Sequence, residues 1–341
     1  MNFNSFEVIF AATMPVINSN KMIVIANDKT IQQAAEIIKG GGLAAFPTET
    51  VYGLGADGLN PIASAKIFEA KKRPQFNPLI LHIAERTSLK DYTVYNDERI
   101  EKLIKKFWPG PLTFVLPKKE IVPDIITSGN LTVAVRMPNH KVALQLIEKC
   151  GTPIAAPSAN RFGHISPTEA AHVAKSLGDK VDLILDGGKC AVGVESTILQ
   201  LAEDKIFLLR PGGLSKEEIE NEVGPIETVV KFSDKPNAPG QLPFHYSPEI
   251  PLSFLSNETL EKYSGAKIGV LFFKEKKVEG SFASEKILSA KGDLKEAAAN
   301  LFKYLHEFEK EKVEIILVEP LHESGLGLAI MDRLKRAARR F

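Results

Sequence analysis

The sequence predicts an α/β protein, with a twisted mixed sheet that carries helices and a second, smaller α/β domain after it. Short apolar runs rich in β-forming residues alternate with helical segments, but not in the strict order that an all-parallel sheet requires. A proline-rich stretch begins near residue 232, and a shorter set of strand and helix patterns follows it. These observations predict two folded domains joined by an extended linker.

Helix ends are marked by capping residues, a proline and glycines. Ser, Thr or Asn can accept hydrogen bonds from the free N–H groups of a first helical turn, and proline is tolerated at the first helical position. A Glu or Gln three residues after Ser or Thr completes a capping box. Glycine ends three of the segments, because it readily adopts the left-handed conformation. The predicted helices begin at Thr30, Asn60, Ser166 and Ser215 and end at Gly40, near Lys71, at Gly178 and at Gly224.

Apolar runs rich in β-forming residues predict the strands. In the first domain they cover residues 43–46, 79–83, 112–116, 131–135, 181–185 and 197–201. After the linker, strands are expected at 267–273 and 314–318, and helices at 293–309 and 328–340. The chain is thus divided into a leader over residues 1–22, a first domain over 23–231, a linker over 232–251 and a small α/β domain over 252–341.

The last predicted helix is basic. Its cations are expected to form a solvated face near the helix C-terminus, where positive charge offsets the macrodipole. Contact with RNA or with a partner protein is the alternative. These cations are Arg333, Lys335, Arg336, Arg339 and Arg340.

Composition excludes several classes of protein. The 341 residues are 44% hydrophobic and 25% charged, with a net charge of +1, as in ordinary soluble domains. No apolar run approaches the ~20 residues of a membrane span, and no basic segment precedes the short apolar piece after Val8. Cys150 and Cys190 are too few for a disulfide framework or a structural zinc site, and Cys150 is interpreted as core. A cytoplasmic location without membrane contact is expected.

One segment matches a dinucleotide-binding fingerprint but lacks the surrounding features that the fingerprint requires. Residues 53–58 read GLGADG and match G-x-G-x-x-G, yet they follow Phe46 through what we interpret as a long loop. The next acid at a strand end, Glu85, comes too late to hold a ribose. No Walker A pattern occurs in the sequence. A dinucleotide site and a P-loop are therefore both disfavoured.

Polar residues gather where loops meet the predicted elements, which is where sites usually lie. The clusters cover residues 47–55, 71–82 and 157–166. Lys71 and Arg73 have a simpler interpretation, since cations near a helix C-terminus offset its dipole. Arg136 ends an apolar strand, where an unpaired cation is costly, so it needs an anion from the protein or from a substrate carboxylate.

Six motifs in order carry a resemblance to a known family. They read PTETVYGLGAD, AKKRPQFNPLILHI, FWPGPLTFVL, TVAVRMPNH, TPIAAPSAN and GVESTIL. Together they closely resemble the YrdC-like threonylcarbamoyl-AMP synthases, from about residue 29 to residue 213. The proline-rich HYSP segment and the small domain after it look like the two-domain form, whose small domain is Rossmann-like. The resemblance implies a large, positively charged cleft formed by the first domain.

The resemblance also implies site residues. The family's Lys-x-Arg and Ser-x-Asn motifs fall on Lys71, Arg73, Ser158 and Asn160, which are taken as catalytic. ATP contacts are expected at Arg73, Asn77, Thr132, Ser158, Ser166, Arg210 and Tyr246, and L-threonine contacts at Thr50, His82, Arg136, Ala156 and Ser196. No protein metal ligands are expected, because Mg²⁺ would be held mainly by ATP phosphates and water.

The implied activity joins L-threonine, bicarbonate and ATP into threonylcarbamoyl-AMP and pyrophosphate. A tRNA threonylcarbamoyl transferase would then pass the group to an adenosine of tRNA, giving threonylcarbamoyladenosine. Direct contact with tRNA is left open. The alternative function is an RNA-binding protein of the same fold without catalysis. Arg136, His82 and Ser196 favour the enzyme, since an RNA clamp would not need a small-molecule pocket. A much longer carbamoyl-transfer maturation enzyme is disfavoured, because two cysteines cannot build its zinc modules.

Overall fold

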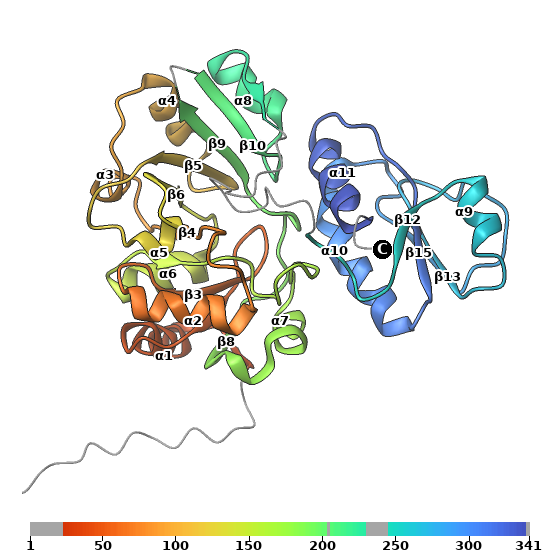
Figure 1. Ribbon diagram of the computed structural model, residues 1–341, viewed down its shortest axis with the longest axis horizontal. Coiled ribbons are helices and arrows are strands. Elements are labelled where there is room, and N and C mark those ends of the chain that lie inside the picture. The colour runs from red at the N-terminus through yellow and green to blue at the C-terminus, as the bar shows by residue number, and fades with distance from the viewer. Residues whose placement is uncertain (1–22, 203–204, 230–244, 339–341) are drawn as a thin grey trace, which may run out of the picture.

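The computed structural model describes residues 23–202, 205–229 and 245–338. Within these residues the chain forms an 11-stranded sheet followed by a 4-stranded sheet, each with its own helices (Figure 1). The predicted leader, residues 232–244 of the predicted linker, and Arg339 and Arg340 lie outside the described residues. The domain boundaries placed there stay predictions.

The larger sheet is mixed, as the sequence predicts. Parallel pairs such as β4 with β6 alternate irregularly with antiparallel pairs such as β5 with β6. From one edge to the other the strands are β1 (Ile23–Ile25), β8 (Leu183–Asp186), β2 (Ala44–Phe46), β3 (Gly53–Asp57), β7 (Ile154–Ala155), β4 (Ile80–His82), β6 (Thr132–Arg136), β5 (Leu112–Pro117), β9 (Thr197–Ala202), β10 (Lys205–Arg210) and β11 (Glu227–Thr228).

Helices pack on this sheet and connect its strands. They are α1 (Asp28–Lys39), α2 (Pro61–Lys71), α3 (Leu89–Tyr92), α4 (Glu98–Phe107), α5 (Asp124–Thr127), α6 (Lys141–Cys150), α7 (Ala170–Leu177), the short 3-10 helix η1 (Gly178–Lys180) and α8 (Lys216–Val223). Two predicted starts are confirmed by cap geometry. The Asn60 side chain accepts hydrogen bonds from the first turn of α2, and Ser215 with Glu218 forms a capping box on α8.

Two other predicted starts are wrong. Helix α1 begins one turn earlier than expected: Asn27 is its N-cap, and Thr30 closes the capping box from the third helical position. Helix α7 begins at Ala170, after Glu169, so Ser166 is not its cap. The Ser166 hydroxyl instead donates to Glu195 at 2.5 Å, a partner that the local sequence cannot indicate.

The glycine-rich segment after Phe46 was also misread. Gly53–Asp57 is not a loop but strand β3, which pairs antiparallel with β2 and β7. A Cβ at Gly55 would lie 2.8 Å from Cε1 of Phe46 and 2.9 Å from Cγ2 of Ile154. The glycines therefore make room for packed side chains of the sheet. This geometry agrees with the prediction that the segment is not a dinucleotide-binding turn.

The apolar core lies between the larger sheet and its helices. Trp108 is buried there and donates its indole N–H to the Leu112 carbonyl at 2.7 Å; the Trp108–Pro109 peptide bond is cis. Cys150 packs with α1 and α6, as predicted, and burial raises the pKa of its thiol to about 12. No helix among the described residues is long and apolar enough to cross a membrane.

The small domain is built on four parallel strands in the order β12 (Leu252–Phe254), β15 (Ile315–Val318), β13 (Ile268–Phe272) and β14 (Ser284–Ile287). Its helices are α9 (Asn257–Lys262), α10 (Leu294–Glu311) and α11 (Leu326–Ala337). The predicted strands at 267–273 and 314–318 and the predicted helix at 293–309 are confirmed to within a few residues. The last helix starts at residue 326 rather than 328.

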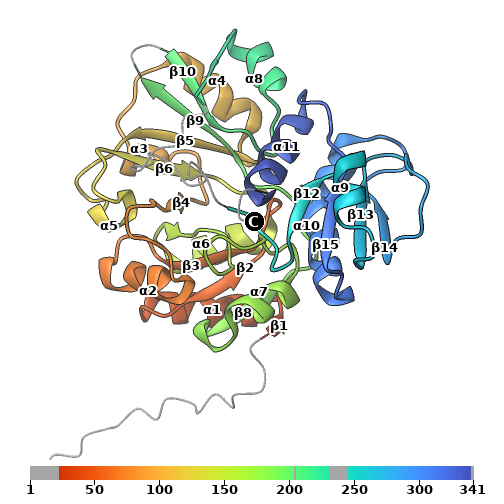
Figure 2. The same cartoon turned by 45° about the vertical axis from the view of Figure 1, so that its right-hand side comes forward.

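Helices α10 and α11 lie on the side of the small domain that faces the larger one (Figures 1 and 2). The contact is close: a Cβ at Gly193 would lie 2.4 Å from the Ala299 Cα. The rings of His172 and His306 stack across it with centroids 3.9 Å apart. The two domains thus share a tightly packed interface.

The prediction of a solvated basic face on α11 is wrong for its inner cations. Arg333 is 1% exposed and Arg336 is 5% exposed. Arg333 contacts Glu195 of the larger domain, and Arg336 pairs with Asp332. Lys335 forms an ion pair with Glu323 on the outer side. A charge pattern alone could not reveal this burial, because Glu195 is 138 residues away in the sequence.

Candidate active site

A pocket of about 540 Å³, open to solvent, lies where the ends of several strands of the larger sheet meet the segment at residue 245. Three arginines and one glutamate are the charged residues among its lining side chains, so the pocket is positive. This agrees with the cleft that the family resemblance implies. The lining residues are Thr48, Thr50, Val51, Tyr52, Gly53, Arg73, Ile80, His82, Arg136, Ala156, Pro157, Ser158, Glu195, Ser196, Arg210, His245 and Tyr246.

Arg136 stands at the end of β6 and is fixed by several partners. Its Nε donates to the Gly110 carbonyl at 3.2 Å, and its Nη1 donates to the Thr50 hydroxyl at 2.9 Å. Glu49 supplies the compensating charge, with Oε1 2.6 Å from Nη2. The geometry of this ion pair is not that of a hydrogen bond, so Nη2 keeps unsatisfied donors. A buried guanidinium with free N–H groups is well suited to bind a carboxylate.

His82 lies beside Arg136, because β4 and β6 are parallel and these residues are paired in register. Its Nδ1 donates to the Ile80 carbonyl at 3.2 Å. Burial, with a further contribution from the Arg136 charge, lowers the pKa of His82 to about 3. The imidazole is therefore neutral at physiological pH.

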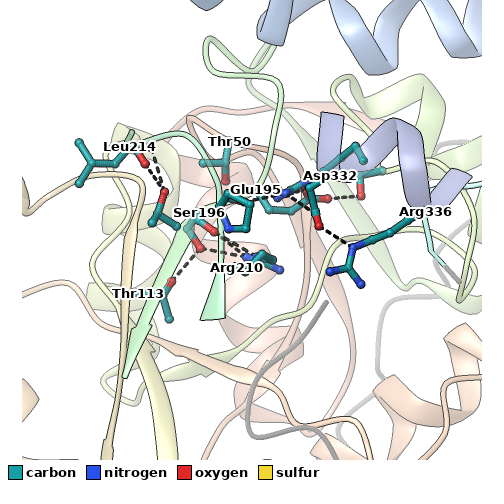
Figure 3. Close-up of polar contacts among 12 residues, drawn as sticks. Thr50, Thr113, Glu195, Ser196, Arg210, Leu214, Asp332 and Arg336 are labelled. Atoms are coloured by element: carbon teal, nitrogen blue, oxygen red, sulfur yellow. Dashed lines mark hydrogen bonds and ion pairs between the residues drawn. The ribbon is translucent and has the colours of Figure 1, made fainter. Parts of the chain in front are cut away.

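Ser196 and Arg210 form the opposite wall. The Ser196 hydroxyl shares a hydrogen bond of 2.7 Å with Thr113, and Arg210 donates to the Ser196 carbonyl at 2.9 Å (Figure 3). The pairing of β9 with β10 holds these two residues together. Burial lowers the pKa of Arg210.

Arg73 places a third arginine on the pocket. Its Nε donates to the Asn77 carbonyl at 3.0 Å and its Nη2 to the Pro78 carbonyl at 2.8 Å. Burial, and then the Arg210 charge, lowers the pKa of Arg73 to about 9, which leaves it cationic at pH 7. The influence of the Arg210 charge on Arg73 shows that positive charge is concentrated here, where a polyanion can be bound.

Lys71 acts on the pocket indirectly. It is 1% exposed and does not line the pocket. Its Nζ donates to the Ser158 carbonyl at 2.5 Å and to the Asn160 carbonyl. The Asn160 side chain in turn donates to the carbonyls of Arg161 and His164. Lys71 and Asn160 thus fix the loop that carries Ser158. This role replaces the simpler interpretation of Lys71 as a cation that offsets the helix dipole.

Comparison with known proteins places this pocket in a family. Residues 36–212 match the family described as Telomere recombination, and residues 214–339 match the Threonylcarbamoyl-AMP synthase, C-terminal domain. The threonylcarbamoyl-AMP synthase of Bacillus subtilis is 45% identical over 326 residues, 92% of this chain and 94% of the relative. That of Pyrococcus abyssi is 45% identical over 324 residues, with 90% and 94% covered. The crystal structure of P. abyssi Sua5 complexed with L-threonine matches with a TM-score of 0.85 and 44% identity, over 93% of this chain and 96% of that one.

The chain belongs to the threonylcarbamoyl-AMP synthase family. Its fold and its standing as an enzyme of this family agree with what the six sequence motifs imply, and the match to the C-terminal domain agrees with the two-domain form that the HYSP segment and the small domain indicate.

The structure brings together most, but not all, of the residues expected in a synthase of this family. All five residues expected to bind threonine line the pocket, and so do Arg73, Ser158, Arg210 and Tyr246. Asn77 is fully buried below Arg73, and its side-chain amide has no hydrogen-bond partner. Thr132, at the start of β6, and Ser166 do not line the pocket. Nucleotide contacts at Asn77, Thr132 and Ser166 stay predictions.

Tyr246 lies both in the pocket and at the interface between the two domains. It lines the pocket, is 1% exposed and has a positive φ of 63°. Its ring stacks on Phe302 of α10, with centroids 5.7 Å apart. The centroid of the His245 ring lies 4.1 Å from that of the Tyr246 ring. A contact with the nucleotide and packing between the domains are therefore compatible roles.

Sequence reasoning missed three charged residues: Glu49, Glu195 and Arg333. The two carboxylates sit inside the motifs PTET and GVEST, among small and apolar residues. Both are buried and both pair with an arginine. An acid embedded in an otherwise uncharged motif is a signal for a buried ion pair, because an unpaired buried charge is costly. The sequence around Arg333 contains no comparable signal of an ion pair.

Proposed function

We propose that this member of the threonylcarbamoyl-AMP synthase family forms threonylcarbamoyl-AMP and pyrophosphate from L-threonine, bicarbonate and ATP. The single observation that carries the proposal is the composition of one pocket. The five residues expected to bind threonine line it together with four of those expected to bind ATP, Arg73, Ser158, Arg210 and Tyr246. The names of the relatives and the L-threonine complex of the P. abyssi protein support the same substrates.

L-Threonine is proposed to bind against Arg136. Its Nη2 is paired with Glu49 by charge but makes no hydrogen bond, so its N–H groups can donate to a substrate carboxylate. Thr50 and Ser196 supply hydroxyls beside this site, and neutral His82 adds no second positive charge. The backbone of Ala156 completes this part of the pocket.

ATP is proposed to bind against Arg73, Arg210 and Ser158, with Tyr246 covering it. In the reaction the threonine nitrogen bonds to the carbon of bicarbonate, with loss of water. An oxygen of the resulting carbamate then attacks the α-phosphorus and pyrophosphate leaves. Phosphoryl chemistry of this kind depends on positioning and on fixed positive charge rather than on a covalent nucleophile. Lys71 and Asn160 hold the Ser158 loop, and the arginines offset the charge on the phosphates.

Magnesium is proposed to enter with ATP, as part of the substrate. Within the described ranges no group of three or more His, Cys, Asp or Glu residues could hold a metal ion. The pocket glutamate, Glu195, is already paired with an arginine. Phosphate oxygens and water would hold the Mg²⁺ that enters with ATP.

The product is a mixed anhydride that water can hydrolyse, so a following transfer reaction must consume it. We propose that a tRNA threonylcarbamoyl transferase in the cytoplasm is the acceptor partner, with threonylcarbamoyladenosine in tRNA as the final product. RNA binding by the same preparation tests whether this protein also contacts tRNA directly.

The test is pyrophosphate release measured with the complete mixture and with threonine or bicarbonate omitted in turn. The proposal requires release that depends on both. Release that persists without threonine would mean simple ATP hydrolysis. No release, together with tight RNA binding, would favour the non-catalytic alternative.

A further inference from the structure

One arginine of the small domain contacts two residues that line the active-site pocket, Glu195 and Tyr246. Arg333 belongs to α11 and is 1% exposed. Its Nε and Nη2 each lie 3.0 Å from Oε2 of Glu195, and its Nη1 donates to the Pro211 carbonyl at 2.6 Å. Asp332, the preceding residue, anchors Nη1 at 3.0 Å. The Arg333 guanidinium is thus held across the interface by Glu195 and the Pro211 carbonyl of the larger domain and by Asp332 of the small domain.

Its partner Glu195 lines the pocket. The other carboxylate oxygen of Glu195 accepts the hydroxyl of Ser166 at 2.5 Å. Burial by itself raises the pKa of Glu195, but Arg333 and then Arg210 bring it below its usual range, so the carboxylate is ionised. Figure 3 shows this cluster, with Glu195, Ser196 and Arg210 from the larger domain and Asp332 and Arg336 from α11.

An ionised glutamate is an unexpected neighbour for a site that takes ATP. Phosphate oxygens and a carboxylate repel each other strongly in a buried, poorly hydrated pocket. The repulsion is offset only if the negative charge of Glu195 is neutralised by a cation that does not itself bind the nucleotide. Arg73 and Arg210 line the pocket and are the cations proposed to bind ATP, whereas Arg333 does not line it.

The same arginine supports a second lining residue. Its guanidinium lies over the Tyr246 ring, 5.1 Å from the centroid, in a cation–π contact. The ring is supported on α10 by Phe302. Both residues that support Tyr246 here therefore come from the small domain.

We infer that Arg333 is a positioning residue of the active site: it neutralises Glu195, holds Tyr246 in place and makes the small domain part of the ATP pocket. The inference rests on the proposed function, since it concerns the same substrate. Without Arg333, the negative charge of Glu195 is uncompensated and opposes the phosphates. Threonine, bound against Arg136, is affected less.

The test compares three variants of the full chain. Arg333→Met removes the cation but keeps an apolar side chain of similar length. Arg333→Met combined with Glu195→Gln removes both charges. Lys175→Met breaks the Lys175–Glu309 ion pair of 2.8 Å, which also crosses the interface but does not line the pocket. Each is measured for melting temperature, for KM of ATP and of threonine, and for ATP binding by calorimetry.

Arg333→Met is expected to raise the KM of ATP at least about tenfold, because breaking a buried ion pair from one side leaves an uncompensated charge. The double variant is expected to return it to within about threefold of wild type, because the coupling between the two charges is then removed. Lys175→Met stays within about twofold, since a half-exposed ion pair contributes little. Threonine KM changes by less than ATP KM in every variant.

Two results would overturn the inference. One is a double variant no better than Arg333→Met, which would make Arg333 merely structural. The other is an equal loss in Lys175→Met, which would assign the effect to loosening of the interface. If wild type releases no pyrophosphate that depends on threonine and bicarbonate, the proposed function fails separately. ATP calorimetry on the same variants then still decides whether Glu195→Gln rescues Arg333→Met.

Discussion

Replacing Arg136 by lysine should separate threonine binding from ATP binding. Arg136 is buried at the end of β6, where Nε and Nη1 contact Gly110 and Thr50. Lysine keeps the positive charge opposite Glu49, so the buried carboxylate stays compensated and the fold is expected to survive. What lysine cannot reproduce is the planar fork with donors in fixed directions.

The magnitude follows from the contacts that are lost. A hydrogen bond to a charged group contributes about 1.5–3 kcal/mol, so losing one such bond to the threonine carboxylate raises Kd about 10- to 150-fold. ATP is proposed to contact Arg73 and Arg210 instead, and neither changes. The Kd of ATP should therefore change by no more than about threefold, because substitutions and contacts at well-separated sites have nearly independent effects.

The assay is calorimetry with each ligand alone, supported by a melting curve. Arg99→Lys is a matched control, because Arg99 pairs with Asp97 at the start of α4, away from the pocket. It should leave both affinities unchanged. Equal losses for threonine and ATP in Arg136→Lys would refute the reasoning and make Arg136 a structural residue.

Three further predictions concern other parts of the molecule. Lys71→Met should lower the melting temperature by about 4–12 °C as well as turnover, because two buried carbonyls lose their donor. His172→Asn should remove a pH-dependent part of the free energy of unfolding. Burial, and then the His306 charge, lower the pKa of His172 in the folded protein to about 3. As pH falls below 6.5 the unfolded chain therefore takes up a proton that the folded protein does not bind, and stability falls. From pH 7 to pH 5 this histidine costs wild type about 2 kcal/mol that the variant does not lose. Tyr246→Ala should release the intermediate faster, because the buried Tyr246 ring lines the pocket and excludes water from it.

Each of these has a contrary outcome. Unchanged melting with lost turnover would mean that Lys71 meets phosphate directly rather than holding the Ser158 loop. Parallel stability curves of wild type and His172→Asn between pH 5 and 7 would mean that the ring is protonated in the fold. Release of the intermediate that is unchanged in Tyr246→Ala would mean that the ring only packs between the domains.

Local patterns predicted much of the fold because their physics is local. An apolar run, a proline at the first helical position or a capping box acts within a few residues, which is why α2, α8 and the predicted strands lie where expected. The six motifs also identified the pocket residues, since a site of this family needs particular side chains at particular strand ends. Thr50, His82, Arg136 and Ser196 converge as implied.

The failures share a different cause, which is contact between distant segments. Gly53–Asp57 is a strand because Phe46 and Ile154 fill the space that side chains would occupy. Ser166 does not cap a helix because Glu195 takes its hydroxyl. Neither partner is visible in the local sequence.

The sequence by itself therefore determined the fold class, the family and the chemical types of the pocket side chains. Only the tertiary structure decided the roles of Lys71, Glu195 and Arg333. A helix with five cations looks solvated until its partner is known, and Arg333 is buried only because Glu195 lies across the domain interface. The desolvation cost of a charge depends on which opposite charge the fold brings to it, and the order of residues along the chain does not contain that distance.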